Sequence, residues 1–370
     1  MVTALAIYVP LLLIAFYLLY FFSENYFVPS LDRLSERFNL SSDISGATFM
    51  AAGSSAPELA VVIASLLVSG NHESIGIGTI IGSALFNLFI IVGAVMVLKS
   101  NTKMVWQPLV RDLVFYALSI ILLFWFFKDG TFSLHEAMIF VGGYVIYFGS
   151  LFMWKKVFPY KDTELHQAND EKENLNKIDA LLIRFIQRIV TLFSKKKSKT
   201  NQLVPRVNNL YFAFMLDVVV IGLLSWLLVH SAIEVSAALG IPEVIIALTV
   251  IALGTSVPDL IASVVVAKQG RPGMAINNAI ASNIFDILIG LGFPFLLLFI
   301  FSSGSVAVDN GNLWVSFFLL MGSIIILTLG FLITKWKTKR FIGWILILLY
   351  AFYLLYQITC VLGLELCNWL

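Results

Sequence analysis

The chain contains a series of apolar runs, each about 20 residues long, separated mostly by short polar segments. A helix needs about 20 apolar residues to cross the hydrocarbon core of a bilayer, where its backbone must satisfy its own hydrogen bonds. Of the 370 residues, 59% are hydrophobic and only 12% are charged, about half the charged fraction of a soluble domain. The pattern predicts an all-α polytopic membrane protein and excludes a soluble enzyme, a nucleic-acid binder and a disordered scaffold.

Ten runs are long enough to be transmembrane helices, and they form two groups of five. We expect a first five-helix repeat in residues 1–154, a polar linker at 155–209 and a second five-helix repeat in 210–370. The expected spans are 2–22, 45–69, 76–98, 110–127, 134–154, 210–230, 243–267, 274–301, 313–334 and 340–362.

The distribution of Lys and Arg predicts how the chain crosses the membrane. The polar segments expected on one side carry 23 of the 24 basic residues, and the opposite side carries only Lys128. Loops rich in Lys and Arg stay in the cytoplasm. We therefore expect a cytoplasmic linker and two extracytoplasmic termini, in a multi-pass protein of the plasma (inner) membrane.

Two motifs of the first half recur in the second half at nearly the same spacing. GSSAPEL at 53–59 matches GTSVPDL at 254–260, and GSALFNL at 82–88 matches ASNIFDI at 281–287. Because each half has an odd number of spans, the second half enters the membrane from the opposite side. Such inverted repeats place a substrate site near the bilayer midplane, between broken helices.

Three carboxylates lie in the middle of predicted spans, far from any Lys or Arg in the sequence: Glu58, Asp259 and Asp286. An ionised carboxylate in hydrocarbon costs several kcal/mol unless it is paired or solvated. Since no basic partner is available, we expect a bound cation or a proton to balance the charge. The alternative is three neutral acids held by hydrogen bonds.

The residues around these acids favour a metal cation over a proton alone. Pro57 leaves the carbonyl oxygen of Gly53 without its helical donor, and Pro258 has the same effect in the second half. Each acid or amide also follows a hydroxyl residue by four positions, which puts both on one helix face. An all-oxygen donor set suits Ca²⁺ and Na⁺. The pairs are Ser54 and Glu58, Thr255 and Asp259, Ser83 and Asn87, and Ser282 and Asp286.

This set of oxygen donors predicts that the protein exchanges one kind of cation for another. Two carboxylates would neutralise one Ca²⁺, and several Na⁺ could share the same oxygens, but both loads could not be bound together. We expect a secondary antiporter that needs no resident cofactor. An intramembrane enzyme would require a nucleophile–base pair or a His-rich site, which the predicted spans lack.

At these residues the chain resembles the cation/Ca²⁺ exchanger superfamily, and most of all its K⁺-dependent Na⁺/Ca²⁺ exchanger branch. The resemblance is carried by residues 46–58, 254–259, 267–270 and 282–288. The resemblance extends over all ten predicted spans.

The resemblance implies that Glu58 and Asp259 are the central Ca²⁺ ligands and ties the use of K⁺ to Asp286. It also implies alternating access, with spans 1 and 6 sliding against the other eight, in a monomer. The other ligands that it implies are the backbone oxygens of Ala51 and Ala252 and the side chains of Ser54, Ser55, Ser83, Asn87, Thr255, Ser256, Ser282 and Asn283.

The nearest alternative is a Ca²⁺/H⁺ exchanger of the same fold, in which Glu58 and Asp259 would carry protons. Sequences of that branch resemble one another in a Gly-Asn-x-x-Glu pattern, and this pattern is absent here. A passive cation channel is a further alternative, although it would need a continuous polar pore. K⁺ dependence stays open, so the expected partners are Ca²⁺ and Na⁺, with or without K⁺, and the lipid bilayer.

Overall fold

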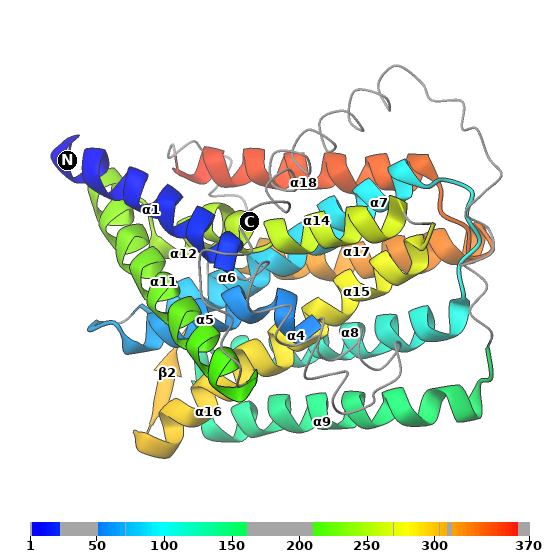
Figure 1. Cartoon of the computed structure of the whole chain (residues 1–370), viewed down its shortest axis with the longest axis horizontal. Coiled ribbons are helices and arrows are strands. Elements are labelled where there is room, and N and C mark those ends of the chain that lie inside the picture. Colours follow the sequence, from blue (N-terminus) through cyan, green and yellow to red (C-terminus); the bar gives the residue numbers. More distant parts are fainter. Residues whose placement is uncertain are drawn as a thin grey trace.

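The computed structural model describes residues 2–22, 51–160 and 210–361, with short gaps at 71, 269, 303 and 309–312. The linker predicted at 155–209 therefore lies almost wholly outside the described residues. Residues 46–50, the start of the segment 46–58 that carries the family resemblance, also lie outside them. The rest is a bundle of helices that run side by side (Figure 1).

The first half consists of helices and one short strand. In chain order these are α1 (Val2–Phe22), α4 (Ala51–Ser54), α5 (Ala56–Leu67), α6 (Glu73–Phe86), the π-helix η3 (Asn87–Ile91), α7 (Val92–Leu98), α8 (Trp106–Phe127), β1 (Thr131–Ser133) and α9 (Leu134–Val157).

The second half also consists of helices and one short strand. Its elements are α11 (Leu210–Leu239), α12 (Glu243–Ile246), the π-helix η5 (Ala247–Ile251), α13 (Ala252–Thr255), α14 (Val257–Lys268), α15 (Pro272–Phe285), the π-helix η6 (Asp286–Leu291), α16 (Gly292–Phe301), β2 (Ser305–Ala307), α17 (Trp314–Ile333) and α18 (Arg340–Val361).

Helices occur within all ten of the predicted apolar runs, so the helical fold class is confirmed. Among the described residues, seven helices are long and apolar enough to cross a membrane, and the segments Ala4–Leu19, Ala56–Leu67 and Glu243–Thr255 are apolar but shorter. The number of membrane crossings stays a prediction. Strands β1 and β2 pair antiparallel, which is a small addition to the all-α expectation.

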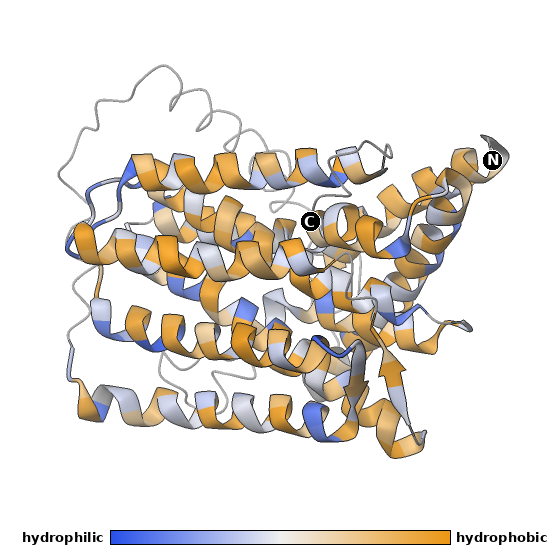
Figure 2. Ribbon diagram, turned by 180° about the vertical axis from the view of Figure 1, so that it is seen from behind, coloured by the Kyte–Doolittle hydropathy of each residue, from blue (hydrophilic) through white to orange (hydrophobic). Residues whose placement is uncertain are grey.

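The surface of the bundle is apolar, as a lipid environment requires. Figure 2 shows that hydrophobic residues make up much of most helices, and many large ones are exposed, among them Ile146, Leu223 and Phe352. The hydrophobic core includes much of α6, η3, α7, α15 and η6. Buried and exposed helix faces are thus both apolar, which fits a multi-pass membrane protein.

Each end of the bundle joins segments from both halves. At one end β1 pairs with β2. At the other end Asn101 N–H donates to the carbonyl oxygen of Thr338 at 2.8 Å, and Met104 N–H donates to that of Trp336 at 2.9 Å. Helices α1 and α11 pack against each other at one flank of the bundle (Figure 1).

Candidate functional site

Two helices are interrupted at matching positions in the two halves. Ser55 separates α4 from α5 with φ −86° and ψ 3°, and Ser256 separates α13 from α14 with φ −87° and ψ 0°. The break predicted from Pro57 and Pro258 is confirmed in place, because a proline two residues later withholds one helical donor. The breaks bring the hydroxyl and carboxylate groups of both motifs to the centre of the bundle.

The other two motif helices each contain a π-turn, which the sequence did not predict. The π-helix η3 begins at Asn87, and η6 begins at Asp286. Single π-turns inside α-helices occur frequently at functional sites. Here they begin at the last polar residue of the second motif in each half, Asn87 and Asp286.

The structure brings all of the predicted side chains into one buried cluster. Each of them is less than one-tenth exposed, and most are fully buried. The cluster consists of Ser54, Ser55, Glu58, Ser83, Asn87, Thr255, Ser256, Asp259, Ser282, Asn283 and Asp286.

Ser83 lies between carboxylates from the two halves. Its Oγ is 3.3 Å from Glu58 Oε1 and 3.3 Å from Asp286 Oδ2, so its single proton can be donated to either one. The hydroxyl of Ser256 lies 3.2 Å from Glu58 Oε1 and 2.9 Å from Ser83 Oγ. Glu58 therefore sits between hydroxyls from α6 and from the break at Ser256.

Two amides organise the surroundings of Asp259. Asn87 Nδ2 donates to Asp259 Oδ2 at 3.4 Å and to Asn283 Oδ1 at 2.9 Å. Asn283 Nδ2 donates in turn to the carbonyl oxygen of Ala84 at 3.1 Å. The amide pair thus links η3 to α15 and orients one oxygen of Asp259.

The remaining hydroxyls contact the broken-helix backbone. Ser54 Oγ donates to the carbonyl oxygen of Ala51 at 3.2 Å and lies 3.3 Å from Ser282 Oγ. Thr255 Oγ1 lies 3.3 Å from the carbonyl oxygen of Ala252. The backbone oxygens singled out in the sequence therefore face the hydroxyls of their own motifs.

Several oxygens of the cluster have no hydrogen-bond partner in the described part of the chain. An unsatisfied buried polar atom costs about 1–3 kcal/mol, and more if it is charged. These oxygens are therefore available to bind a cation. They are Ser55 Oγ, Glu58 Oε2, Asn87 Oδ1, Asp259 Oδ1 and Asp286 Oδ1.

The carboxylates of the cluster have no basic partner among the described residues. The ion pairs found among the described residues join His72 to Glu243 and Arg111 to Asp112, and neither involves the cluster. Nor do three His, Cys, Asp or Glu residues form a conventional metal cluster in the described ranges. The carboxylates instead alternate with hydroxyls and amides, which gives a mixed set of oxygen donors.

A fourth buried carboxylate, which the sequence analysis missed, lies in α8. That helix begins at Trp106, four residues before the start of the predicted span 110–127, so Arg111 and Asp112 lie well inside it. Arg111 Nε donates to Asp112 Oδ1 at 2.8 Å, and Tyr147 Oη donates to the same oxygen at 3.1 Å. The adjacent opposite charges in the sequence were the available signal.

Two further polar groups were not singled out in the sequence. The hydroxyl of Tyr116, one turn after Asp112, is buried and has no hydrogen-bond partner among the described residues. His72 Nδ1 lies 3.0 Å from the carboxylate of Glu243, which ties the start of α6 to the start of α12. Neither residue had a distinctive pattern in the sequence.

Comparison with known proteins identifies the family of the chain. The family model for "Sodium/calcium exchanger protein" matches residues 8–153 and 209–359. Sodium/potassium/calcium exchanger 4 of Mus musculus is 27% identical over 93% of this chain and 79% of its own length. Sodium/potassium/calcium exchanger 2 of Gallus gallus is 26% identical over 90% and 74%.

Two solved structures share the fold. The H⁺/Ca²⁺ exchanger CAX superposes with a TM-score of 0.65 at 16% identity, over 94% of this chain and 82% of that one. The sodium-calcium exchanger NCX_Mj superposes with a TM-score of 0.55 at 22% identity, over 95% and 98%. Because the family model covers most of the residues in both halves, the chain belongs to the sodium/calcium exchanger family of membrane ion transporters.

Proposed function

We propose that the protein is a secondary active antiporter that exchanges Ca²⁺ for Na⁺ by alternating access at the buried oxygen cluster. The observation that carries the proposal is the set of unpartnered oxygens on Glu58, Asp259, Asp286, Asn87 and Ser55. Hard cations prefer oxygen ligands, and these five belong to four separate helical segments that converge on one point.

In this proposal Glu58 and Asp259 are the central Ca²⁺ ligands, because each offers a free carboxylate oxygen and comes from a different half. Asp286 supplies a further charge for a monovalent ion. The backbone oxygens of Ala51 and Ala252 and the side chains of Ser54, Ser55, Ser83, Asn87, Thr255, Ser256, Ser282 and Asn283 complete the Na⁺ and Ca²⁺ sites.

Electrostatics then couples the two ions. Three carboxylates can balance one Ca²⁺ and one monovalent ion, or a set of Na⁺ ions, but not both loads together. The empty site is costly in a low dielectric, since bare carboxylates repel one another there. The loaded site changes access more readily than the empty one, which makes Ca²⁺ and Na⁺ movement obligatorily linked.

We further propose that the two halves, 1–154 and 210–370, are inverted five-helix repeats, with a cytoplasmic linker at 155–209 and both termini outside the plasma membrane. The cross-half contacts support this, because the basic segments around Lys103 and Lys337 lie together while β1 and β2 pair elsewhere. One chain supplies every donor, so a monomer is sufficient for transport.

The packing of α1 against α11 at one flank supports a mechanism in which these two helices slide against the others. Sliding exposes the site first to one side and then to the other. K⁺ moving with Ca²⁺ is the variant that the names of the relatives favour. Proton exchange is the second candidate, favoured by the likeness to the H⁺/Ca²⁺ exchanger.

Flux into liposomes tests the proposal. Purified protein is reconstituted with Na⁺ inside, and ⁴⁵Ca²⁺ uptake is measured after dilution into Na⁺-free medium with K⁺, then with choline in place of K⁺, then with a pH gradient alone. We expect uptake driven by the Na⁺ gradient, and its loss in choline would establish K⁺ co-transport. Uptake driven only by the pH gradient would contradict Na⁺ exchange and assign proton exchange.

A further inference from the structure

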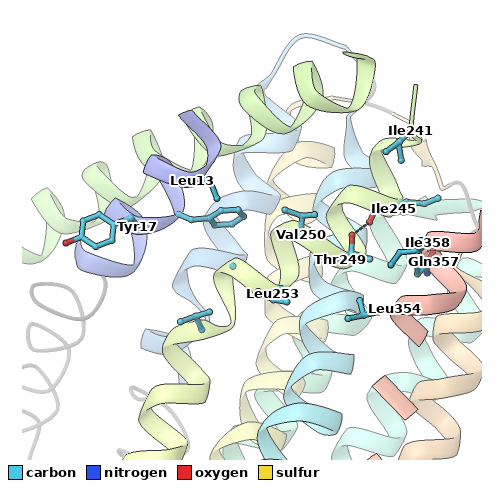
Figure 3. A pocket seen from close by; sticks show the side chains of 13 residues that line it. Leu13, Tyr17, Ile241, Ile245, Thr249, Val250, Leu253, Leu354, Gln357 and Ile358 are labelled. Atoms are coloured by element: carbon cyan, nitrogen blue, oxygen red, sulfur yellow. Dashed lines mark hydrogen bonds between the residues drawn. The ribbon is translucent and has the colours of Figure 1, made fainter. Parts of the chain in front are cut away.

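A cavity of about 710 Å³ lies beside the broken helix of the second half, between α1, the α12–α14 segment and α18 (Figure 3). Its volume falls within the roughly 300–1,000 Å³ of small-molecule sites. The lining is almost entirely apolar and includes Leu13, Phe16, Leu253 and Ile358. Its ligand must therefore be mostly hydrocarbon.

The cavity is continuous with the surface that faces lipid. Leu13 is 60% exposed and Ile358 is 54% exposed, and both lie on helices of a membrane protein. Water is scarce at that depth, so the surrounding medium that can enter is the acyl chains of lipids.

One polar group in the lining lacks a partner. The hydroxyl of Thr249 is satisfied within its own helix, since it donates to the carbonyl oxygen of Ile245 at 2.7 Å. Gln357, by contrast, is only 3% exposed, and its Nε2 has no hydrogen-bond partner among the described residues. A ligand of this cavity should therefore carry one hydrogen-bond acceptor.

The lining of the cavity indicates where the hydrogen-bond acceptor and the hydrocarbon part of the ligand would lie. Gln357 lies one turn from the end of α18 at Val361, near the membrane interface, and Figure 3 shows it on the same side as Ile245. From Ile241 the lining continues to Val257 beside the helix break, a path of up to roughly 24 Å of helix. Such a site accepts a long chain with a polar group at one end.

We propose that the cavity binds one acyl chain of a bilayer phospholipid, with Gln357 Nε2 donating to the ester carbonyl oxygen. The proposal relies on the membrane placement described above. An ester carbonyl lies at the interface and its chain extends toward the midplane, which matches the order of polar and apolar lining along the cavity.

The bound chain would contact the transport site through two residues. A Cβ added at Gly254 would lie only 2.1 Å from Phe16 Cε1, so the ring of α1 packs directly on the backbone next to Thr255. The acyl chain lies against both partners. A bound acyl chain would therefore affect the movement of α1 relative to the broken helix.

Photo-crosslinking in liposomes tests the site. The protein is reconstituted with a phosphatidylcholine that carries a diazirine in one acyl chain, illuminated, digested and mapped by mass spectrometry. We expect label on α13 and α18 residues of the cavity, and its loss in Leu253→Trp and in Ile358→Trp, which fill the space. The control is Leu329→Trp, at a position that is 52% exposed on α17 and outside the cavity.

The hydrogen bond has its own test. Gln357→Leu should weaken labelling by the ester-linked lipid about fivefold, the factor that corresponds to about 1 kcal/mol, and leave labelling by an ether-linked analogue unchanged. Label spread evenly over the outer helices, unaffected by the cavity variants, would mean ordinary bilayer contact and would overturn the proposal. Because labelling does not need ion flux, site-specific label in a protein without Na⁺/Ca²⁺ exchange would support the lipid site while refuting the proposed transport.

Discussion

The three carboxylates of the cluster are oriented by hydroxyls and amides, and Glu58 and Asp286 share the hydroxyl of Ser83. Glu58 accepts from hydroxyls of Ser83 and Ser256, and Asp259 accepts from the amide of Asn87. In each case one carboxylate oxygen is engaged and the other is left without a partner among the described residues. The donors thus orient the free oxygens toward a common ligand without consuming them.

Neutralising a central carboxylate should abolish transport without unfolding the protein. Glu58→Gln retains an oxygen acceptor for Ser83 and Ser256 but removes the charge that balances a divalent ion. We expect at least a tenfold loss of ⁴⁵Ca²⁺ uptake, as for an interaction worth more than about 1.4 kcal/mol. The matched control is Ser65→Ala, which changes a buried hydroxyl of the same helix that donates only to Val62. Equal uptake in Glu58→Gln and wild type would remove Glu58 from the site.

The buried Arg111–Asp112 pair gives a prediction about stability. Asp112→Asn leaves the Arg111 charge buried without its partner, and breaking a buried pair costs about 3–5 kcal/mol. We expect a clearly lower melting temperature in detergent. Replacing the whole group, as Arg111→Met and Asp112→Leu with Tyr147→Phe, should recover most of the loss, because the hydroxyl of Tyr147 would otherwise lose its acceptor. If Asp112→Asn alone melted like wild type, the pair would not be an important support of α8.

At the scale of elements, the contact between α1 and the broken helix depends on a glycine. Gly254→Ala would put a methyl group into the ring of Phe16, and such overpacking costs about 1–3 kcal/mol. We expect slower transport and a lower melting temperature, with recovery when Phe16→Leu is added. Gly222→Ala on α11, where no atom lies within 4 Å of the added carbon, should be harmless. Failure of Phe16→Leu to relieve Gly254→Ala would argue against this contact.

Element by element, apolar length and proline position were sufficient to predict most of the helices and both breaks. The π-turns at Asn87 and Asp286 were not predictable, because widening one helical turn has no residue signature and depends on packing. The β1–β2 pair was missed for a similar reason, since strands of three residues form only when two distant loops meet. The start of α8 was placed four residues too late because Gln107 and Pro108 look like loop, although a proline is tolerated in the first turn of a helix.

The sequence predicted which residues form the candidate cluster more completely than it predicted the contacts between them. The repeat identified eight of the side chains that converge, among them Ser54 and Asp286, because matching motifs in two halves carry the same information twice. Ser55, Ser256 and Asn283 came only from the family resemblance. What the sequence lacked was which donor faces which acceptor. The burial of Tyr116 depends on how α8 packs on α15, and no local pattern records that packing.

For the whole molecule, the proposed orientation can be tested by accessibility. The exposed residues Lys103 and Lys337 lie at one junction of the two halves, and Thr131 and Ser305 lie at the other. Each is changed to Cys in a background without the native cysteines and is treated with an impermeant maleimide in right-side-out and inverted vesicles. We expect the first pair to react only in inverted vesicles and the second only in right-side-out ones. Reaction of all four from one side would contradict the inverted arrangement.

The central claim is that one buried oxygen cluster holds Ca²⁺ and Na⁺ in turn. Equilibrium binding of ⁴⁵Ca²⁺ to the purified protein, with increasing Na⁺ and with choline as the matched salt, tests it most directly. The account predicts saturable Ca²⁺ binding that Na⁺ displaces more steeply than a single competing ion would. It also predicts that binding is lost in the double variant Glu58→Gln, Asp259→Asn. Ca²⁺ binding that is the same in the double variant as in wild type, or that Na⁺ affects no more than choline does, would contradict it.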